Sequence, residues 1–415
     1  MTTRLDTATT ILRRSLLLML SMGIGFALLE VGFRWFRWHQ MGQIDAPGYP
    51  YHFMQPDPVY HHRYAASTTV EDRRVDYDVT YTLNALGLRG SRDYGLKPSG
   101  VMRLLMLGDS FPFGIGVNDD EPFPVLVQQA LDAREAGIEV INAGVGSYSP
   151  ILHYLTLRDR YLAWDPDAVI LWLDFCDIQD DDLYARHLLY DDEGRVAACH
   201  SDYVNGRIDW GGRLLLRSAF LKYLHEKFVR SARKMQMLGV RGYLWAKLRG
   251  EDTKLNAVHM EGKRRARVAL VRYDRFLMIR GAATPEELER YWQLTGSYLL
   301  KIKALLDERG IPFVLGMYPY GVQVGPAHWH DGRVCHMFEQ GRTYDDPLPF
   351  ELVEAFGARH GIPVINSYPS FVAARDAQLF LPMDGHFTPA GHRVLASHLL
   401  RDPIFLNLMD GLRRE

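Results

Sequence analysis

Ser110 stands where a short apolar run stops abruptly, because residues 102–107 (MRLLML) are followed by Gly108, Asp109 and then the serine. Five of the six residues in the run are apolar, which is typical of a strand that is buried on both faces. Glycine and aspartate after such a strand favour a sharp turn. The sequence therefore predicts that a buried strand presents Ser110 at the carboxyl edge of a sheet, where open α/β sheets place their chemistry.

Asp384 and His386 lie two residues apart near the other end of the chain, just before Thr388 and Pro389. Threonine followed by proline is typical of a helix start, with threonine as the cap and proline at the first helical position. An imidazole can remove the proton of a serine hydroxyl as it attacks an ester carbonyl, and a carboxylate can orient the ring. We therefore expect His386 to be the base and Asp384 its orienting partner, with His392 as the alternative base.

Four sequence blocks, in this order, resemble the SGNH, or GDSL-type, hydrolase superfamily of serine esterases and acyltransferases. The blocks are GDSFPFG from Gly108, VINAGVGSYSP from Val140, LDFCDIQDD from Leu173 and DGHFTPAGH from Asp384. The Asp-x-His spacing in the last block is similar to that of the branch containing the alginate O-acetylation proteins. The resemblance implies a flavodoxin-like three-layer α/β sandwich with a parallel sheet, and a catalytic triad in which Ser110 carries the acyl group.

The resemblance also implies donors for the oxyanion of the tetrahedral intermediate, at Ser110, Ser147 and Cys176. The chain departs from the family here, because Ser147 stands where glycine is usual and Cys176 where asparagine is usual. A backbone N–H donor tolerates serine, whereas a thiol is a weak donor, and losing one good donor typically costs about a hundredfold in rate. Cys176 therefore leaves three alternatives open: another group donates to the oxyanion in its place, the enzyme is slow or specialised, or the site no longer catalyses. The expected supporting residues are Asp109, Asn142 and Asp177.

Two groups of polar residues resemble metal ligands. The first is an acidic cluster after a predicted strand, and the second combines histidine with cysteine; their members are Asp174, Asp177, Asp180, Asp181 and Asp182, and His328, His330, Cys335 and His336. The place of the first suits loop hydrogen bonding and helix capping, and the spacing of the second matches no zinc pattern. We expect no metal and no cofactor.

The composition bounds the class of protein. With 415 residues, of which 47% are hydrophobic and 24% charged, the chain is long enough for one large α/β domain with insertions or for two domains. A formal net charge of −2 gives no global affinity for polyanions. We expect no nucleic-acid partner, because the compartment outside the cytoplasm that is predicted below offers none. Three cysteines do not make a disulfide framework, although Cys199 and Cys335 could pair in an oxidising compartment.

Residues 15–33 are apolar over a length that can cross a bilayer, which takes about 20 helical residues. Flanking arginines and aromatic residues favour a cytoplasmic tail over 1–14 and a transmembrane signal anchor over 15–36. The main domain would then be periplasmic or extracellular, on a single-pass protein of the cell inner membrane; a cleaved signal peptide is the alternative. Glu30 precedes Arg34 by four residues, which predicts an ion pair within the helix.

The rest of the chain alternates between strand-like and helix-like segments. Residues 37–100 form a predicted stalk and N-terminal extension, in which 75–83 alternates as an exposed antiparallel strand does. Residues 101–415 form the predicted hydrolase domain, and its alternation implies right-handed crossovers and a parallel sheet. The expected strands are 102–107, 138–142, 168–173, 311–317 and 362–365, and the expected helices are 123–134, 150–163, 285–308 and 349–360.

An insertion at about 185–283 breaks this alternation. Within it, residues 213–275 hold seventeen Lys and Arg against five acidic residues, together with an apolar stripe at helical spacing. Such a basic amphipathic element could lie on anionic lipid or face an anionic glycan or a partner protein. The simpler interpretation, which we favour, is a helix that packs on the core and exposes a solvated basic face.

These features together predict a membrane-anchored serine esterase or O-acyltransferase. Its substrates would be acyl esters, in the first place acetyl esters, of cell-envelope or exported polysaccharide, and a membrane partner could supply the acyl group. The alternatives are a lipid or thioester hydrolase, and a catalytically weak scaffold that uses the same fold to bind glycan or an assembly partner. Cys176 is the residue that keeps the scaffold hypothesis open.

Overall fold

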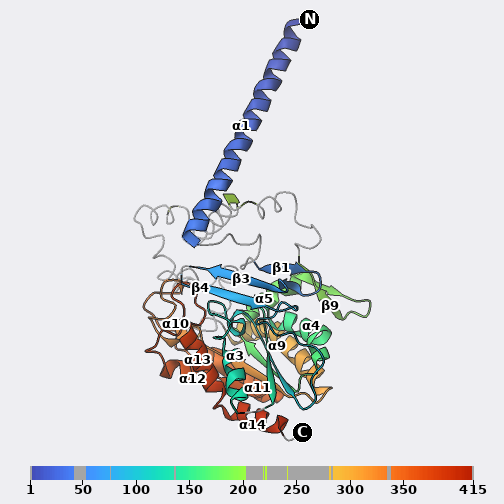
Figure 1. The fold of residues 1–415 in the computed structure, drawn as a ribbon, viewed down its shortest axis with the longest axis vertical. Helices are drawn as coiled ribbons and strands as arrows, with labels where there is room; N and C mark the ends of the chain where they lie inside the picture. Colours follow the sequence, from blue (N-terminus) through green and yellow to red (C-terminus); the bar gives the residue numbers. More distant parts are fainter. Residues whose placement is uncertain are drawn as a thin grey trace. The chain divides into compact units, whose positions relative to one another are not determined.

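The structure is a computed structural model in which two compact units are recognised, Met1–His52 with Gly206–Tyr243, and Phe53–Asn205 with Leu244–Glu415 (Figure 1). The residues that it describes are 2–41, 53–74, 76–134, 137–201, 218, 220, 221, 241, 280, 281, 284–333 and 338–413. Most of the predicted basic element at 213–275, most of the insertion at 185–283, Cys335 and His336 lie outside these residues, and so does the suggested pairing of Cys199 with Cys335.

Five parallel strands form the central sheet of the second unit. The order across the sheet is β11-β10-β7-β5-β6, with β5 (Met102–Gly108), β6 (Ile138–Gly144), β7 (Ala168–Leu173), β10 (Phe313–Met317) and β11 (Val364–Asn366). Numbered from β5 along the chain, this order is 2-1-3-4-5, the flavodoxin-like arrangement. The predicted α/β class and parallel sheet are confirmed.

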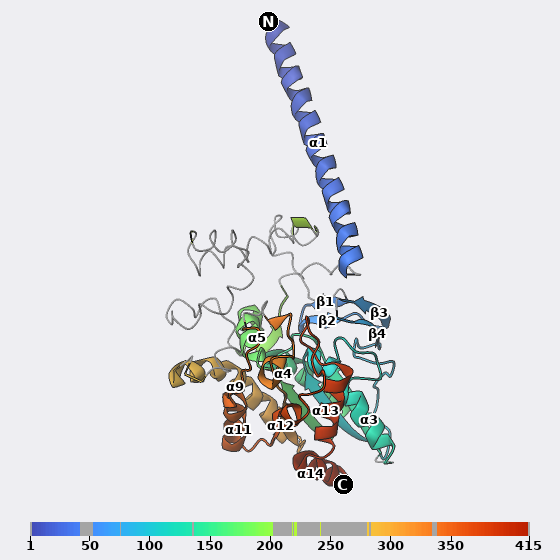
Figure 2. The same ribbon diagram turned by 90° about the vertical axis from the view of Figure 1, so that its left-hand side faces the viewer.

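Helices cover both faces of the sheet (Figure 2). One face carries α3 (Phe123–Asp132), α12 (Tyr368–Ala373) and α13 (Pro389–Leu399), which pack against one another. The other carries α4 (Pro150–Asp159), α5 (Asp177–Tyr184), α9 (Pro285–Asp307) and α11 (Leu348–His360). The last helix, α14 (Pro403–Leu412), follows α13. The result is a three-layer sandwich around a core of buried aliphatic and aromatic side chains.

The element boundaries follow the sequence with small shifts that have local causes. The strands expected at 311–317 and 362–365 begin later, at Phe313 and Val364, and each follows a proline, which has no N–H to donate to a ladder. The helix expected at 150–163 ends at Asp159 and is continued by a 3-10 turn over Tyr161–Trp164. The predicted capping box of α9 is present, with Thr284 accepting from the Glu287 N–H.

Residues 53–89 belong to the same compact unit as the sheet. They form two antiparallel hairpins, β1 (Met54–Asp57) with β2 (His61–Tyr64), and β3 (Thr68–Arg73) with β4 (Asp78–Leu83). The antiparallel strand expected at 75–83 is β4, and Val75 lies outside the described residues. Alternate β4 side chains, those of Val79, Tyr81 and Leu83, are buried, so one face of this hairpin packs onto the domain. A third hairpin pairs β8 (Leu188–Tyr190) with β9 (Val196–Cys199).

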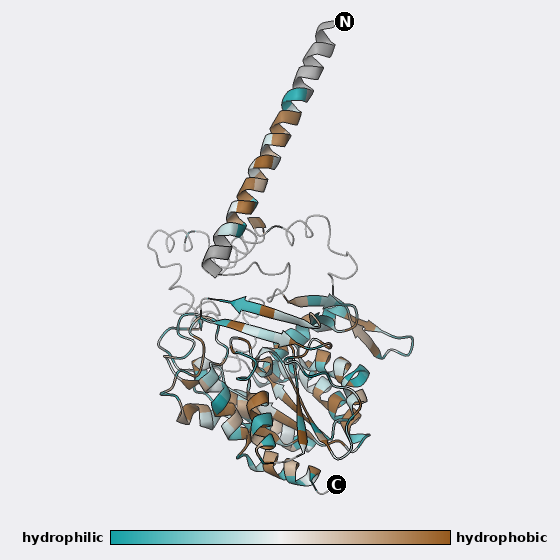
Figure 3. Ribbon diagram, viewed as in Figure 1, coloured by the Kyte–Doolittle hydropathy of each residue, from teal (hydrophilic) through white to brown (hydrophobic). Residues whose placement is uncertain are grey.

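The first unit contains the long helix α1 (Thr2–Met41). Its stretch Arg13–Trp35 is long and apolar enough to span a membrane, as a single-pass anchor or a signal sequence would be, and Figure 3 shows it as a nearly continuous brown run. The predicted pair is confirmed, because Arg34 Nε lies 2.6 Å from Glu30 Oε1. The other Glu30 oxygen accepts from the Ser218 hydroxyl at 2.7 Å and the Phe220 N–H at 3.1 Å. This glutamate is thus fully engaged in polar contacts.

Candidate active site

Strand β5 delivers Ser110 to the carboxyl edge of the sheet. Gly108, at the end of the strand, has a φ of 157°, and a Cβ there would lie 2.5 Å from the Pro112 ring, so the turn requires glycine. Asp109 follows as the cap of the short helix α2 (Ser110–Phe113) and accepts from the Phe111 N–H at 2.9 Å. In the 2-1-3-4-5 order, β5 and β7 flank the point where the strand order reverses, the usual place for a ligand site.

His386 lies between Ser110 and Asp384. Its Nε2 is 2.7 Å from Ser110 Oγ, and its Nδ1 is hydrogen-bonded to Asp384 Oδ1. A proton on Nδ1 faces the carboxylate and leaves Nε2 free to accept the serine hydroxyl. The structure therefore brings together the three residues that the sequence predicts as nucleophile, base and orienter, in hydrogen-bonding order.

Charges around the imidazole favour its protonated form. Burial by itself would lower the pKa of His386, but the charge of Asp384 and its hydrogen bond outweigh burial and raise that pKa above 6.5. Burial likewise opposes the ionised form of Asp384, yet the interaction with His386 holds the pKa of Asp384 below 3.8. The pair is thus poised to hold a proton on the imidazole when one arrives from Ser110.

His392, the alternative base, is engaged elsewhere. It is buried, and its Nδ1 accepts the backbone N–H of Phe123, at the start of α3, at 3.1 Å. Burial lowers the pKa of His392 to about 3, so the ring is neutral near pH 7. Its contact caps α3 rather than reaching the Ser110 hydroxyl.

The loop after β6 carries Ser147 and is tied to the nucleophile turn by Asn142. The Asn142 side chain donates to the Pro112 carbonyl at 2.8 Å and accepts from the Gly144 N–H at 3.1 Å. Ser147 has a φ of 61°, an uncommon conformation for a residue other than glycine, and its carbonyl accepts the Tyr184 hydroxyl at 2.7 Å. A glycine would adopt this conformation without strain.

Cys176 stands directly before α5, after the loop that follows β7. Its backbone N–H donates to Asp174 Oδ1 at 2.8 Å. Burial, and then the charge of Asp174, raise the pKa of the Cys176 thiol well above 9.0, so the thiol is neutral at pH 7. The third predicted supporting residue, Asp177, accepts from the Asp174 N–H at 3.1 Å. Burial and the neighbouring carboxylates raise the pKa of Asp177 well above 3.8.

Two tyrosines after β10 complete the base of the site, and the sequence analysis did not assign them a role. The Tyr318 hydroxyl lies 2.9 Å from Asp109 Oδ1 and 3.3 Å from Asp174 Oδ2, and Tyr320 donates to the other Asp174 oxygen. Burial and the charge of Asp174 raise the pKa of Asp109 to about 7. A signal was available, because both tyrosines directly follow a predicted strand and so lie at the same sheet edge as Ser110.

Among the described residues, one group of three could in principle hold a metal: Asp109, Asp174 and Cys176 each place a ligand atom within 4.8 Å of the others. The carboxylate oxygens of this group already accept hydrogen bonds from the two tyrosine hydroxyls. The group is therefore better described as a hydrogen-bonded network beneath the nucleophile than as a set of ligands.

Asp181, from the same acidic cluster, caps α4. It accepts from the Ile151 N–H at 3.0 Å and the Ser149 hydroxyl at 2.5 Å, and from Thr295 of α9 at 2.7 Å. Asp181 therefore has the role in hydrogen bonding and helix capping that was expected for the acidic cluster. The contact to Thr295 also links α5 with α9, two helices on the same face of the sheet.

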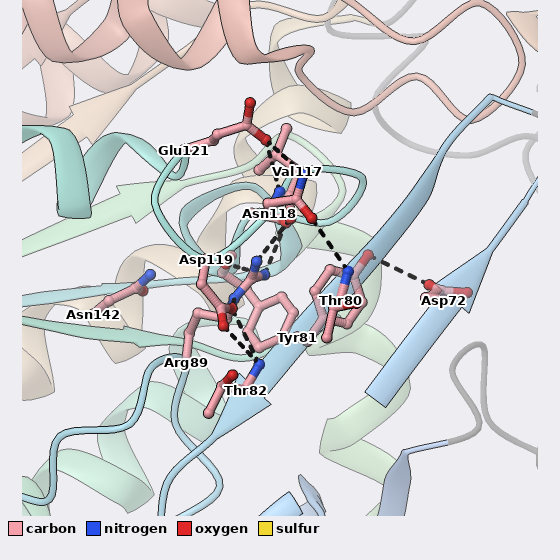
Figure 4. A network of polar contacts seen from close by, with 12 residues as sticks. Asp72, Thr80, Tyr81, Thr82, Arg89, Val117, Asn118, Asp119, Glu121 and Asn142 are labelled. Atoms are coloured by element: carbon pink, nitrogen blue, oxygen red, sulfur yellow. Dashed lines mark hydrogen bonds and ion pairs between the residues drawn. The ribbon is translucent and has the colours of Figure 1, made fainter. Parts of the chain in front are cut away.

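Arg89, which follows β4, contacts the loop at residues 114–119 (Figure 4). We call this segment after Ser110 the nucleophile loop. Its guanidinium lies 2.6 Å from Asp119 Oδ1 and donates to the carbonyls of Gly114 at 3.1 Å and Val117 at 2.7 Å. The group also lies 4.4 Å from the ring centre of Tyr81. The sequence analysis did not identify Arg89, because no local pattern predicts that it contacts the nucleophile loop.

The loop after β6 has a similar support. His62 Nε2 donates to the Gly146 carbonyl at 2.8 Å, and the Gly146 N–H donates to the Tyr64 hydroxyl at 2.7 Å. Both side chains belong to β2, and Gly146 directly precedes Ser147. The N-terminal hairpins therefore hold the backbone next to an expected oxyanion donor.

No protein-family model matches the chain, and no curated protein matches it. Among solved structures, the chain is similar to a catalytic mutant of an acetylxylan esterase from Geobacillus stearothermophilus, at 13% identity and a TM-score of 0.35, over 74% of this chain and 95% of that one. It is also similar to LAE5, an alpha/beta hydrolase enzyme from the metagenome of Lake Arreo, at 13% identity and a TM-score of 0.34, over 77% and 99% of the two chains. A third likeness is to the acetyl xylan esterase AlAXEase, at 12% identity and a TM-score of 0.35, over 72% and 98%. Likeness at this level establishes neither an activity nor a substrate for this chain.

Proposed function

We propose that this protein is a serine esterase or O-acyltransferase of the SGNH, or GDSL, type. One observation carries the proposal: His386 Nε2 lies 2.7 Å from Ser110 Oγ while its other nitrogen is hydrogen-bonded to Asp384. A serine hydroxyl is a poor nucleophile at neutral pH until a base accepts its proton. Acyl transfer requires a serine that is hydrogen-bonded to a base, with the base in turn hydrogen-bonded to a group that orients it. The buried Ser110 at the sheet edge has this arrangement.

The proposed reaction has two halves. Ser110 Oγ attacks the ester carbonyl and forms a C–O bond, while His386 takes the hydroxyl proton. The tetrahedral intermediate then collapses, the ester C–O bond breaks, and the imidazolium protonates the departing alcohol. In the second half, water or a sugar hydroxyl gives its proton to His386 and attacks the acyl carbonyl, forming a new C–O bond. The bond between the acyl carbon and Ser110 Oγ then breaks, the imidazolium returns its proton to Oγ, and the acid or the new ester leaves.

The oxyanion is proposed to be held by the backbone N–H groups of Ser110 and Ser147 and by the Cys176 thiol. Backbone donors fixed in a turn need no reorganisation during the reaction, and the supports described for both loops hold them in place. The thiol is neutral at pH 7, so it can donate, although weakly. We infer a slow or specialised enzyme for this reason.

Acyl esters of cell-envelope or exported polysaccharide, in the first place acetyl esters, are the proposed substrates. The support is the membrane-capable stretch Arg13–Trp35 and the Asp-x-His spacing, which is similar to that of the alginate O-acetylation branch. We further propose that the protein is a single-pass inner-membrane protein with its catalytic unit outside the cytoplasm, and that a membrane partner supplies acyl groups if it acts by transfer.

Cys176 favours one second candidate, a scaffold of the same fold that binds glycan or an assembly partner and turns over slowly or not at all. The reason is the weak donor in place of the family's amide. The two candidates differ in what Ser110 does, since a scaffold would bind the same ligand whether or not the hydroxyl is present.

Hydrolysis of p-nitrophenyl acetate by the full-length protein in detergent separates the two candidates. We expect turnover by the parent protein and a loss of at least about a hundredfold in Ser110→Ala. Added oligosaccharides would compete with water for the acyl-enzyme and reveal transfer as an acetylated sugar. Equal, residual rates in the parent and in Ser110→Ala would contradict the enzyme proposal and favour the scaffold.

A further inference from the structure

The turn between β3 and β4 touches the loop that carries the acid–base pair. Asp76 lies in this turn, and its Oδ2 accepts hydrogen bonds from the backbone N–H groups of Met383 at 2.7 Å and Asp384 at 2.6 Å. Hydrogen bonds to an ionised acceptor are about twice as strong as neutral ones. We propose that Asp76 is a positioning residue, which sets the place of Asp384 and hence the orientation of His386. This inference rests on the proposed function.

The same loop is also held by a second segment, residues 329–332. The N–H groups of Asp331 and Gly332 both donate to the Pro382 carbonyl at 2.9 Å. Trp329 packs against Gly385, where an added Cβ would lie 2.6 Å from the indole. A loop held by one segment can still pivot, whereas one held by two separate segments has a defined position. Asp76 supplies the second attachment.

The same hairpin is attached to the nucleophile loop. The Tyr81 hydroxyl in β4 accepts the Gly116 N–H at 3.0 Å. Arg89 donates to the carbonyls of Gly114 and Val117 in that loop, and Figure 4 shows its contact with Val117. Ser110 and His386 are 276 residues apart in sequence, so their 2.7 Å contact depends on elements that bridge the two loops. The β3–β4 hairpin is one such bridge, because it holds one loop through Tyr81 and the other through Asp76.

One charge near the turn, that of Arg74, favours an ionised Asp384. Arg74, two residues before Asp76, pairs with the buried Asp72 at 2.9 Å, and its charge helps to lower the pKa of Asp384. The Asp76 carboxylate faces two N–H dipoles of the loop. Its partners lie 307 and 308 residues away in sequence, so these contacts are not those of a local Asx turn.

Three substitutions of Asp76 separate geometry from charge. Asp76→Ala removes the acceptor, Asp76→Asn keeps an accepting oxygen but loses the charge, and Asp76→Glu keeps the charge but moves it by one methylene. Displacing a catalytic group by about 1 Å can cost about a hundredfold in rate. With p-nitrophenyl acetate and the full-length protein, we expect kcat to fall by about 10- to 100-fold in the Ala variant with little change in KM. The kcat of the Asn variant should stay within about threefold of the parent's, and the kcat of the Glu variant should lie between those of the Asn and Ala variants.

Asp78→Ala is the matched control. Asp78 lies in the same hairpin, two residues on, and its carboxylate makes an exposed ion pair with Arg73 at 2.7 Å. This pair does not involve either active-site loop, so the variant should keep the parent's kcat. Thermal unfolding of each variant shows whether the hairpin still folds, and the Asn and Glu variants decide the question if the Ala variant does not.

Two readouts report on positioning without relying on turnover. Amide hydrogen exchange at Met383 and Asp384 should be faster in Asp76→Ala than in the parent. The pKa of His386, followed by NMR of isotope-labelled histidines, should fall in the same variant, because a loosened Asp384 stabilises the imidazolium less. The charged groups that act on His386 are Asp384, Asp109 and Asp174, and the substitution changes none of them directly.

Faster exchange, a lower His386 pKa and a lower kcat in Asp76→Ala, with near-parental values in Asp76→Asn, would support the inference. Unchanged exchange, or faster exchange with an unchanged His386 pKa, would overturn it. An active parent with a fully active Asp76→Ala variant would also overturn it and leave the proposed function intact. A parent without esterase activity would contradict the proposed function instead, and the exchange and titration results would still decide whether Asp76 positions the pair.

Discussion

Ser110, His386 and Asp384 form a line of hydrogen bonds in which each residue depends on the next. The carboxylate raises the pKa of His386, and His386 lowers the pKa of Asp384. The Tyr318 hydroxyl bridges the buried carboxylates of Asp109 and Asp174. The charges of Asp384, Asp109 and Asp174 raise the pKa of His386 and so favour its imidazolium form.

This arrangement predicts the pH dependence of ester turnover. His386 must be neutral to accept the serine proton, so kcat/KM should rise with pH along a limb centred above 6.5, the unperturbed value. Asp384→Asn removes the charge that raises the pKa of His386, and the limb should move to lower pH while the rate falls by about 10³- to 10⁴-fold. A pH–rate profile of both proteins tests this. A limb that stays in place in Asp384→Asn would contradict the assignment.

Cys176 gives a second prediction at a single position. Cys176→Asn replaces a weak donor by an amide, and if the side chain faces the oxyanion, kcat for p-nitrophenyl acetate should rise by about 10- to 100-fold. Cys176→Ser, which keeps a small hydroxyl donor, is the matched control and should change kcat by less than about tenfold. No gain in the Asn variant would show that this position does not serve the oxyanion.

The elements that hold these residues are of two kinds. The strands of the parallel sheet end at one edge and present Ser110, the loop of Cys176, and the two tyrosines after β10. The N-terminal hairpins hold the resulting loops, through Arg89 at the nucleophile loop, His62 at the loop of Ser147 and Asp76 at the loop of Asp384. The extension is therefore part of the site's framework.

Arg89 allows this framework role to be measured as stability. Arg89→Leu would leave buried carbonyls of the nucleophile loop without a donor, at about 1–3 kcal/mol for each unsatisfied group, so we expect a loss of about 2–4 kcal/mol in unfolding free energy together with a lower kcat. Arg73→Leu, in an exposed ion pair of the β3–β4 hairpin that precedes Arg89, should change the unfolding free energy by about 0.5 kcal/mol or less. Urea unfolding, followed by tryptophan fluorescence, gives the unfolding free energies of the two variants. Equal losses in Arg89→Leu and Arg73→Leu would contradict the proposed role of Arg89 in holding the nucleophile loop.

The parts of this molecule that could be predicted from sequence are those that produce a pattern among neighbouring residues. Apolar runs bounded by turn residues mark β5 and β7, and strand–helix alternation implies their parallel order. Ser110, Asp384 and His386 stand in short blocks whose residue types already suggest the chemistry. Arg89 and Asp76 could not be found this way, because their partners lie up to 308 residues away and no spacing encodes such contacts.

Reaction of the full-length protein with a fluorophosphonate probe, followed by peptide mass spectrometry, is the most direct test of the central claim. Such a probe reacts with a serine that a neighbouring base has activated. We predict one covalent adduct, on Ser110, that forms at least about a hundredfold more slowly in His386→Ala, while the His392→Ala protein, if folded, labels like the parent. Absence of the adduct from a folded parent protein, or labelling that is indifferent to His386, would contradict the account.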